Sequence, residues 1–182
     1  MVNDVLREIE AKMKKSVDAL RQHLTTVRTG RASPALVEHM QVGAYGSPMP
    51  MNQLAGISTP DARMIVIQPY DASMIKAIEK AILASDLGLT PSNDGNVIRI
   101  PLPALTEERR KELVKVIHKF AEEGRVAIRH ARTEAITRIK KAEHVSEDEK
   151  KHTEKDVQKL HDEHSRLVDE AVKAKSAEIM EV

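Results

Sequence analysis

Basic residues recur at helical spacing in the charged stretch that follows residue 106. His118, Arg125 and Arg132 are seven residues apart, and Arg129 lies four after Arg125 and three before Arg132. Residues at these separations share one side of a helix. Guanidinium groups bind phosphate oxygens through two parallel hydrogen bonds, so a row of them can follow a nucleic-acid backbone. The spacing therefore indicates a candidate RNA- or DNA-binding row.

The same arginines could instead form a solvated helix face with local salt bridges, which is the more common arrangement of surface arginine. Glu122 precedes Arg125 by three residues and Arg129 by seven, so it can neutralise part of the row. No glutamate or aspartate occurs between Glu123 and Glu134, which favours binding. The pattern alone leaves both interpretations open.

Three further arginines are candidates for the same nucleic-acid surface. Arg28 and Arg31 flank Gly30 in the stretch VRTGRASP, and Arg110 lies near the start of the basic helix. Cations in the last turn of a helix are also stabilised by its dipole, which gives Arg28 an alternative, structural role. Gly30 is expected to end the first helix.

Enzymatic and metal-binding patterns have little support. His161 and His164 are three residues apart and could share a metal ion, but no third ligand is evident and His164 falls on an apolar stripe. The sequence has no Gly-rich phosphate loop, zinc-protease motif or nucleophile elbow. We expect no catalytic residue, no metal site and no cofactor.

Composition limits the cellular setting. The 182 residues carry a net charge of +1 and no cysteine, which excludes a disulfide framework and thiolate chemistry. The first residues mix acids and bases, unlike a signal peptide, and no apolar run approaches the roughly 20 residues that cross a bilayer. We therefore expect a soluble cytoplasmic monomer with no membrane partner.

Two kinds of sequence alternate along the chain. All eight prolines lie between Pro34 and Pro103, and six of the seven glycines lie between Gly30 and Gly95. The flanks are charged and helical. The organisation predicted is a helical domain formed by 1–29 and 106–182, with a small domain, 31–104, inserted after the first helix. The chain passes between them near 30–31 and 104–105, so Gly30, Arg31, Ala104 and Leu105 are candidate hinge residues.

The flanks predict three long amphipathic helices that bury their stripes against one another. The first stripe contains Leu6, Ile9, Met13, Val17, Leu20, Leu24 and Val27. The second contains Leu113, Ile117, Phe120, Gly124, Ala127, Ala131, Ala135 and Ile139, and the third contains Val157, Leu160, His164, Leu167, Ala171 and Ala174. Thr106 and Ser146 are expected N-caps, the latter in a capping box with Glu149.

The middle of the chain predicts a small α/β unit that is rich in strands. Strands are expected near 36–42, 52–58, 63–68 and 96–100. One helix, capped by Asp71 and ended by Gly88, lies between the last two. The fold class expected is therefore α+β: a long antiparallel three-helix bundle with an inserted α/β domain.

Three blocks of the sequence carry a resemblance to a known family. VRTGRASP (27–34), EKAILASDLGL (79–89) and IRIPLPALTEERRKEL (98–113), followed by Arg129 and Arg132, are similar to the bacterial ribosome recycling factor family. The resemblance extends over nearly the whole chain and implies an L-shaped, tRNA-like molecule. The turn between Lys140 and Ser146 is about three residues shorter than is usual in that family.

The resemblance also implies a function in protein biosynthesis after translation termination. Members bind the ribosome across large-subunit ribosomal RNA and, with elongation factor G and GTP, promote its splitting into subunits. The family's functional arginines correspond here to Arg28, Arg31, Arg110, Arg129 and Arg132. The alternatives are a coiled-coil adaptor or a general RNA-binding protein without a splitting role, and a histidine-based metalloenzyme has the least support.

Overall fold

The computed structural model describes residues 2–181, which divide into two compact units. Unit 1 contains Met1–Leu24 and Val114–Ala177, and unit 2 contains Thr25–Leu113 and Glu178–Val182. The molecule is of mixed class, with long helices and a small sheet domain, as predicted. Within the described part of the chain, no helix is long and apolar enough to cross a membrane.

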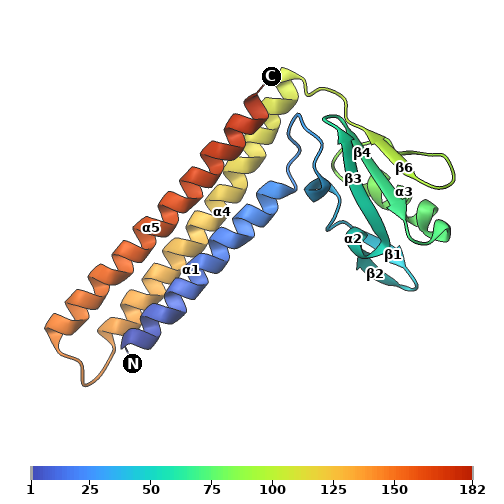
Figure 1. Cartoon of the computed structure of the whole chain (residues 1–182). Coiled ribbons are helices and arrows are strands. Elements are labelled where there is room, and N and C mark those ends of the chain that lie inside the picture. Colours follow the sequence, from blue (N-terminus) through green and yellow to red (C-terminus); the bar gives the residue numbers. More distant parts are fainter. Residues whose placement is uncertain (1, 182) are drawn as a thin grey trace. The chain divides into compact units, whose positions relative to one another are not determined.

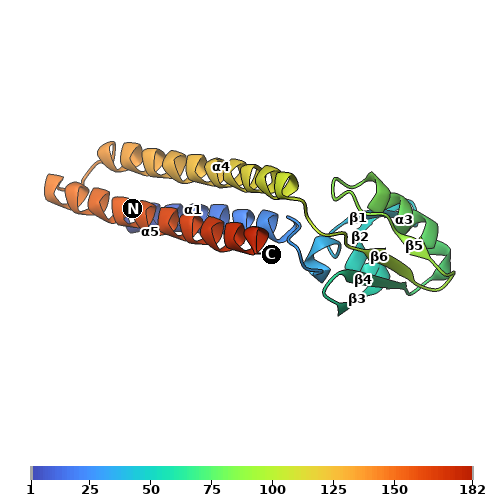
Figure 2. The ribbon, with the colours of Figure 1, turned by 90° about the horizontal axis from the view of Figure 1, so that it is seen from above.

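Unit 1 is built on most of the length of three long helices that lie side by side: α1 (Val2–Thr25), α4 (Glu107–Lys140) and α5 (Glu147–Met180) (Figures 1 and 2). Helix α4 runs antiparallel to the other two. Two ion pairs join α1 to α4: Lys12 with Glu134, and Glu8 with Arg138. The earlier residue of α1 pairs with the later residue of α4, so the two helices run in opposite directions. The bundle is therefore the antiparallel arrangement predicted from the apolar stripes.

The start of each later helix is fixed by the predicted cap. Thr106 Oγ1 accepts a hydrogen bond from the Arg109 N–H at 3.1 Å, and Ser146 Oγ accepts one from the Glu149 N–H at 3.1 Å. These bonds satisfy N–H groups that have no partner within the helix. Helix α1, in contrast, ends at Thr25 rather than at Gly30. The consecutive β-branched residues Thr25, Thr26 and Val27 disfavour helix at this point.

The buried face of the bundle is wider than the predicted stripes. Ala127 and Ala174 are exposed, contrary to expectation, whereas Ala121, Ile128 and Val168 are fully buried. Each helix contacts two neighbours, so its buried surface spans more of the circumference than a single stripe. The rotation of α4 about its own axis matters for function, because it decides which side chains of α4 face water.

Unit 2 contains a four-stranded antiparallel sheet of order β3-β4-β6-β5 and a separate hairpin. The sheet strands are β3 (Ala55–Asp61), β4 (Met64–Pro69), β5 (Ser92–Asn93) and β6 (Ile98–Pro101). The hairpin pairs β1 (Gln41–Ala44) with β2 (Ser47–Pro50), followed by the short helix α2 (Met51–Leu54). Helix α3 (Ile75–Ala84) follows a 3-10 turn, Ala72–Met74, and another 3-10 turn covers Pro34–Leu36.

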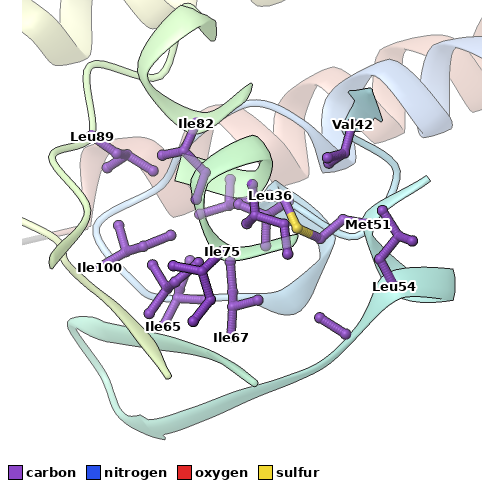
Figure 3. Packing of buried hydrophobic residues seen from close by; sticks show 14 of the residues in the cluster. Leu36, Val42, Met51, Leu54, Ile65, Ile67, Ile75, Ile82, Leu89 and Ile100 are labelled. Atoms are coloured by element: carbon purple, nitrogen blue, oxygen red, sulfur yellow. The ribbon is translucent and has the colours of Figure 1, made fainter. Parts of the chain in front are cut away.

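The core of unit 2 is aliphatic and centred on the sheet (Figure 3). Ile65, Ile67, Ile98 and Ile100 alternate with exposed or partly exposed residues along β4 and β6 and are fully buried. Asp71 caps the turn before α3 as predicted, accepting a hydrogen bond from the Ser73 N–H at 2.9 Å.

The expected strands near 36–42 and 52–58 were only partly right. The first range contains only the last residue of the 3-10 turn and the beginning of β1. The second begins in α2 and continues as β3. The hairpin was missed because its turn is Tyr45-Gly46, both with positive φ (51° and 83°). Tyrosine rarely adopts that conformation, so the usual Asn-Gly signal of a hairpin is absent.

Candidate nucleic-acid interface

The exposed side of α4 carries Arg125, Arg129 and Arg132, which we call the arginine row. Ile128 and Ala131 are buried between these positions, and they fix the rotation of the helix so that the row faces outward. The Arg129 side chain is 50% exposed and the Arg125 side chain 30%. Sequence spacing predicted this shared face correctly.

A carboxylate lies between two members of the row. Glu122 Oε1 accepts from Arg129 Nη2 at 2.7 Å, and Glu122 Oε2 lies 3.6 Å from Arg125 Nη1. The hydrogen bond from Arg129, followed by the charges of Arg129 and Arg125, lowers the pKa of the Glu122 carboxyl below its usual value. Glu122 is therefore ionised at neutral pH and neutralises part of the row.

Helix α5 supplies a second carboxylate. Asp169 Oδ1 accepts from Arg125 Nη2 at 2.7 Å, and the Asp169 side chain is 65% exposed. No spacing in the sequence indicates this pair, because residues 125 and 169 meet only when α4 and α5 pack antiparallel. Arg125 thus has two acidic neighbours.

Arg132 has a neutral partner instead. Arg132 Nη1 donates to Gln158 Oε1 on α5 at 3.4 Å, and Gln158 Nε2 donates to Asp162 Oδ1 at 2.9 Å. Hydrogen bonds from His161 and then Gln158 lower the pKa of Asp162. Among the described residues no carboxylate lies within salt-bridge distance of Arg132, so its charge is the least compensated of the row.

The remaining candidate arginines lie in unit 2. Arg28 Nη2 donates to the Pro103 carbonyl, and Arg110 Nη2 donates to the Leu105 carbonyl at 3.3 Å. Burial, then the charge of Arg109, lowers the pKa of Arg28. Its buried Nε has no hydrogen-bond partner among the described residues. Arg28 and Arg110 are thus half-buried and engaged with the backbone.

Arg31, by contrast, is exposed. It lines a hollow of about 610 Å³ together with Arg63, Arg110, Glu178 and Glu181. The acidic residues in this hollow reduce its positive character.

The two histidines of the candidate metal pair contact groups on their own helix. His164 is 7% exposed, and its Nδ1 donates to the Leu160 carbonyl at 2.7 Å. His161 Nδ1 lies 3.1 Å from Asp162 Oδ1. Within residues 2–181, no group of three His, Cys, Asp or Glu side chains could hold a metal ion.

Comparison with known proteins gives the family. The family model described as ribosome recycling factor matches residues 20–180. This chain belongs to the ribosome recycling factor family. Ribosome-recycling factors of Chloroflexus aurantiacus and Roseiflexus castenholzii are 56% and 53% identical over the full length of both chains. These alignments span 185 positions, three more than the 182 residues of this chain.

Solved structures agree with this family assignment. A solution structure of the ribosome recycling factor superposes with a TM-score of 0.82 at 46% identity, covering 100% of this chain and 98% of that chain. A second structure reaches a TM-score of 0.68 at 46% identity over 100% of both chains. That structure comprises models for the T. thermophilus ribosome recycling factor and the E. coli elongation factor G bound to the E. coli post-termination complex.

Proposed function

We propose that this chain is a ribosome recycling factor in function as well as in family. It binds the post-termination ribosome through large-subunit ribosomal RNA and, with elongation factor G and GTP, promotes splitting into subunits. The observation that carries this proposal is full-length identity above 50% to ribosome-recycling factors. The relative bound with elongation factor G at the post-termination complex supports the same partners.

The arginine row is the part of the bundle that we assign to RNA. Its guanidinium groups contact phosphates and release counterions, so binding weakens as salt rises. Phosphate contacts fix position without reading sequence. The ion pairs to Glu122 and Asp169 are exposed, and such pairs contribute only about 0–1 kcal/mol, so phosphates can replace them at small cost.

The three candidate arginines of unit 2 differ in how far each is available to contact RNA. Arg31 is exposed and free to meet RNA phosphate, whereas Arg28 and Arg110 combine that role with hydrogen bonds to the Pro103 and Leu105 carbonyls. We assign RNA contact first to Arg31 and structural support first to Arg28 and Arg110.

The two stretches of chain near 30–31 and 104–105 are proposed as the hinge of the factor. Gly30 is exposed, and a Cβ placed on it would meet no atom within 4 Å, so backbone rotation there is not hindered by packing. Arg31, Ala104 and Leu105 complete the hinge. The small domain turns about these residues and offers a surface to elongation factor G.

The chain supplies no catalytic group or cofactor in this proposal and acts as a cytoplasmic monomer. The free energy for splitting comes from GTP hydrolysis by elongation factor G. The factor transmits force from its partner to the ribosome.

Binding to purified large subunits, measured as a function of salt, tests the RNA assignment. Arg129→Ala and Arg132→Ala should each weaken binding and reduce the slope of log K against log salt by about 0.7–0.9. Arg166→Ala is the matched control, because it removes one exposed arginine of α5 that, among the described residues, pairs only with Glu170, four residues later. Parental binding by both row variants would refute the assignment.

A subunit-splitting assay separates the alternatives. The factor should split ribosomes with elongation factor G and GTP, whereas a general RNA-binding protein would bind without splitting. An adaptor would form concentration-dependent oligomers and tolerate Arg132→Ala.

A further inference from the structure

Glu122 is the only carboxylate of the described chain that contacts two arginines of the row. One oxygen accepts from Arg129 at 2.7 Å and the other lies 3.6 Å from Arg125. Glu122 and Arg129 are seven residues apart, about 10 Å along the helix axis, so both side chains must extend along the surface to meet. The Glu122 side chain is nevertheless 54% exposed, which leaves it accessible for displacement.

A carboxylate and a nucleic-acid phosphate offer similar anionic groups to arginine. A phosphodiester presents two negatively charged oxygens, and guanidinium groups bind either anion in the same planar geometry. Glu122 and an RNA phosphate therefore compete for the same donors on Arg125 and Arg129. They also repel each other, because both are negatively charged.

We propose that Glu122 is an internal competitor of ribosomal RNA, which occupies the arginine row in the free factor and must be displaced when RNA binds. The proposal rests on the RNA-binding function assigned to the row above. Its consequence is that Glu122 lowers affinity and speeds release. A factor that acts repeatedly on many ribosomes has a use for such a limit, since tight binding would hold it on the separated subunit.

The neighbouring residue provides a control. Glu123 is also exposed and lies on the next position of α4, but it forms no ion pair within the described residues. Glu122→Gln and Glu123→Gln change the net charge and the side-chain size identically. A difference between them therefore reports the contact with the row and not the overall charge.

The test measures equilibrium binding to purified large subunits and the rate of dissociation from them. Glu122→Gln should tighten binding about three- to tenfold, chiefly through slower dissociation, because it removes an exposed ion pair and a repulsion. Glu123→Gln should change binding less than twofold. In an Arg129→Ala background, the gain from Glu122→Gln should shrink by at least half, because its main partner is gone.

Two outcomes overturn the proposal. Equal effects of Glu122→Gln and Glu123→Gln would mean that only overall charge matters. Weaker binding of Glu122→Gln, with an unchanged circular dichroism spectrum, would mean that Glu122 orients the arginines for RNA. In both cases Arg129→Ala would still weaken binding if the row is the RNA site, so failure of this inference is distinct from failure of the proposed function.

Discussion

Gly124 offers a test of how the helix that carries the arginine row is packed. The residue is buried in the middle of α4, yet a Cβ built on it would meet no atom within 4 Å. Its φ is not positive, so alanine can adopt the same backbone conformation. The substitution Gly124→Ala should therefore stabilise the protein.

The magnitude follows from two contributions. Alanine in a helix interior is about 1 kcal/mol more favourable than glycine. A fully buried methyl group adds up to about 0.8 kcal/mol, of which we count less than half because the new Cβ makes no close contact. The sum is about 1–1.5 kcal/mol, which for a chain of this length raises Tm by about 2–6 °C.

Differential scanning calorimetry of Gly124→Ala measures this shift. Gly88→Ala is the matched control, because the same atoms are added at a residue with φ +64°, where a side chain costs about 1–2 kcal/mol. The two variants should move the stability of their units in opposite directions. A lower Tm for Gly124→Ala would refute the reasoning, since it would require a closer contact at residue 124. Binding to large subunits should be unchanged, because the new methyl group faces the core and not the arginine row.

Three other predictions concern unit 2. Gly30→Pro should fold nearly as the parent yet fail to split ribosomes with elongation factor G, because proline fixes φ and restricts Thr29; normal splitting would remove residue 30 from the hinge. Arg28→Met should lower the free energy of unfolding by about 1 kcal/mol, because the Pro103 carbonyl loses a charged donor, while the salt slope of ribosome binding falls less than in Arg129→Ala. An unchanged unfolding midpoint in urea would contradict the structural role of Arg28. Hydrogen bonds from the Val97 N–H, Arg99 and the Asn96 N–H hold the pKa of Asp94 well below its usual value. The stability that Asp94 contributes is therefore present above the ordinary aspartate pKa and lost as pH falls through the lowered one, and Asp94→Asn should flatten unfolding free energy against pH in that acidic range.

The local features of this protein were predictable because they depend on residues close in the chain. Thr106, Ser146 and Asp71 cap the turns that follow them, since each side chain needs only an N–H two or three residues away. That Arg125, Arg129 and Arg132 share one face of the helix follows from helical periodicity alone. The three apolar stripes likewise predicted the antiparallel bundle, because long one-sided helices must bury those stripes together.

Other features depended on how the elements pack. Asp169 and Gln158 meet the arginine row only because α5 returns antiparallel to α4, and no spacing within one helix reports that contact. Ala127 faces water and Ile128 the core because α4 has two neighbours, which shifts its buried face away from a single stripe. The sequence by itself determined which positions of α4 carry the arginine row. Packing decided which carboxylates contact these arginines, because an ion pair between two helices requires both backbones to be in place first.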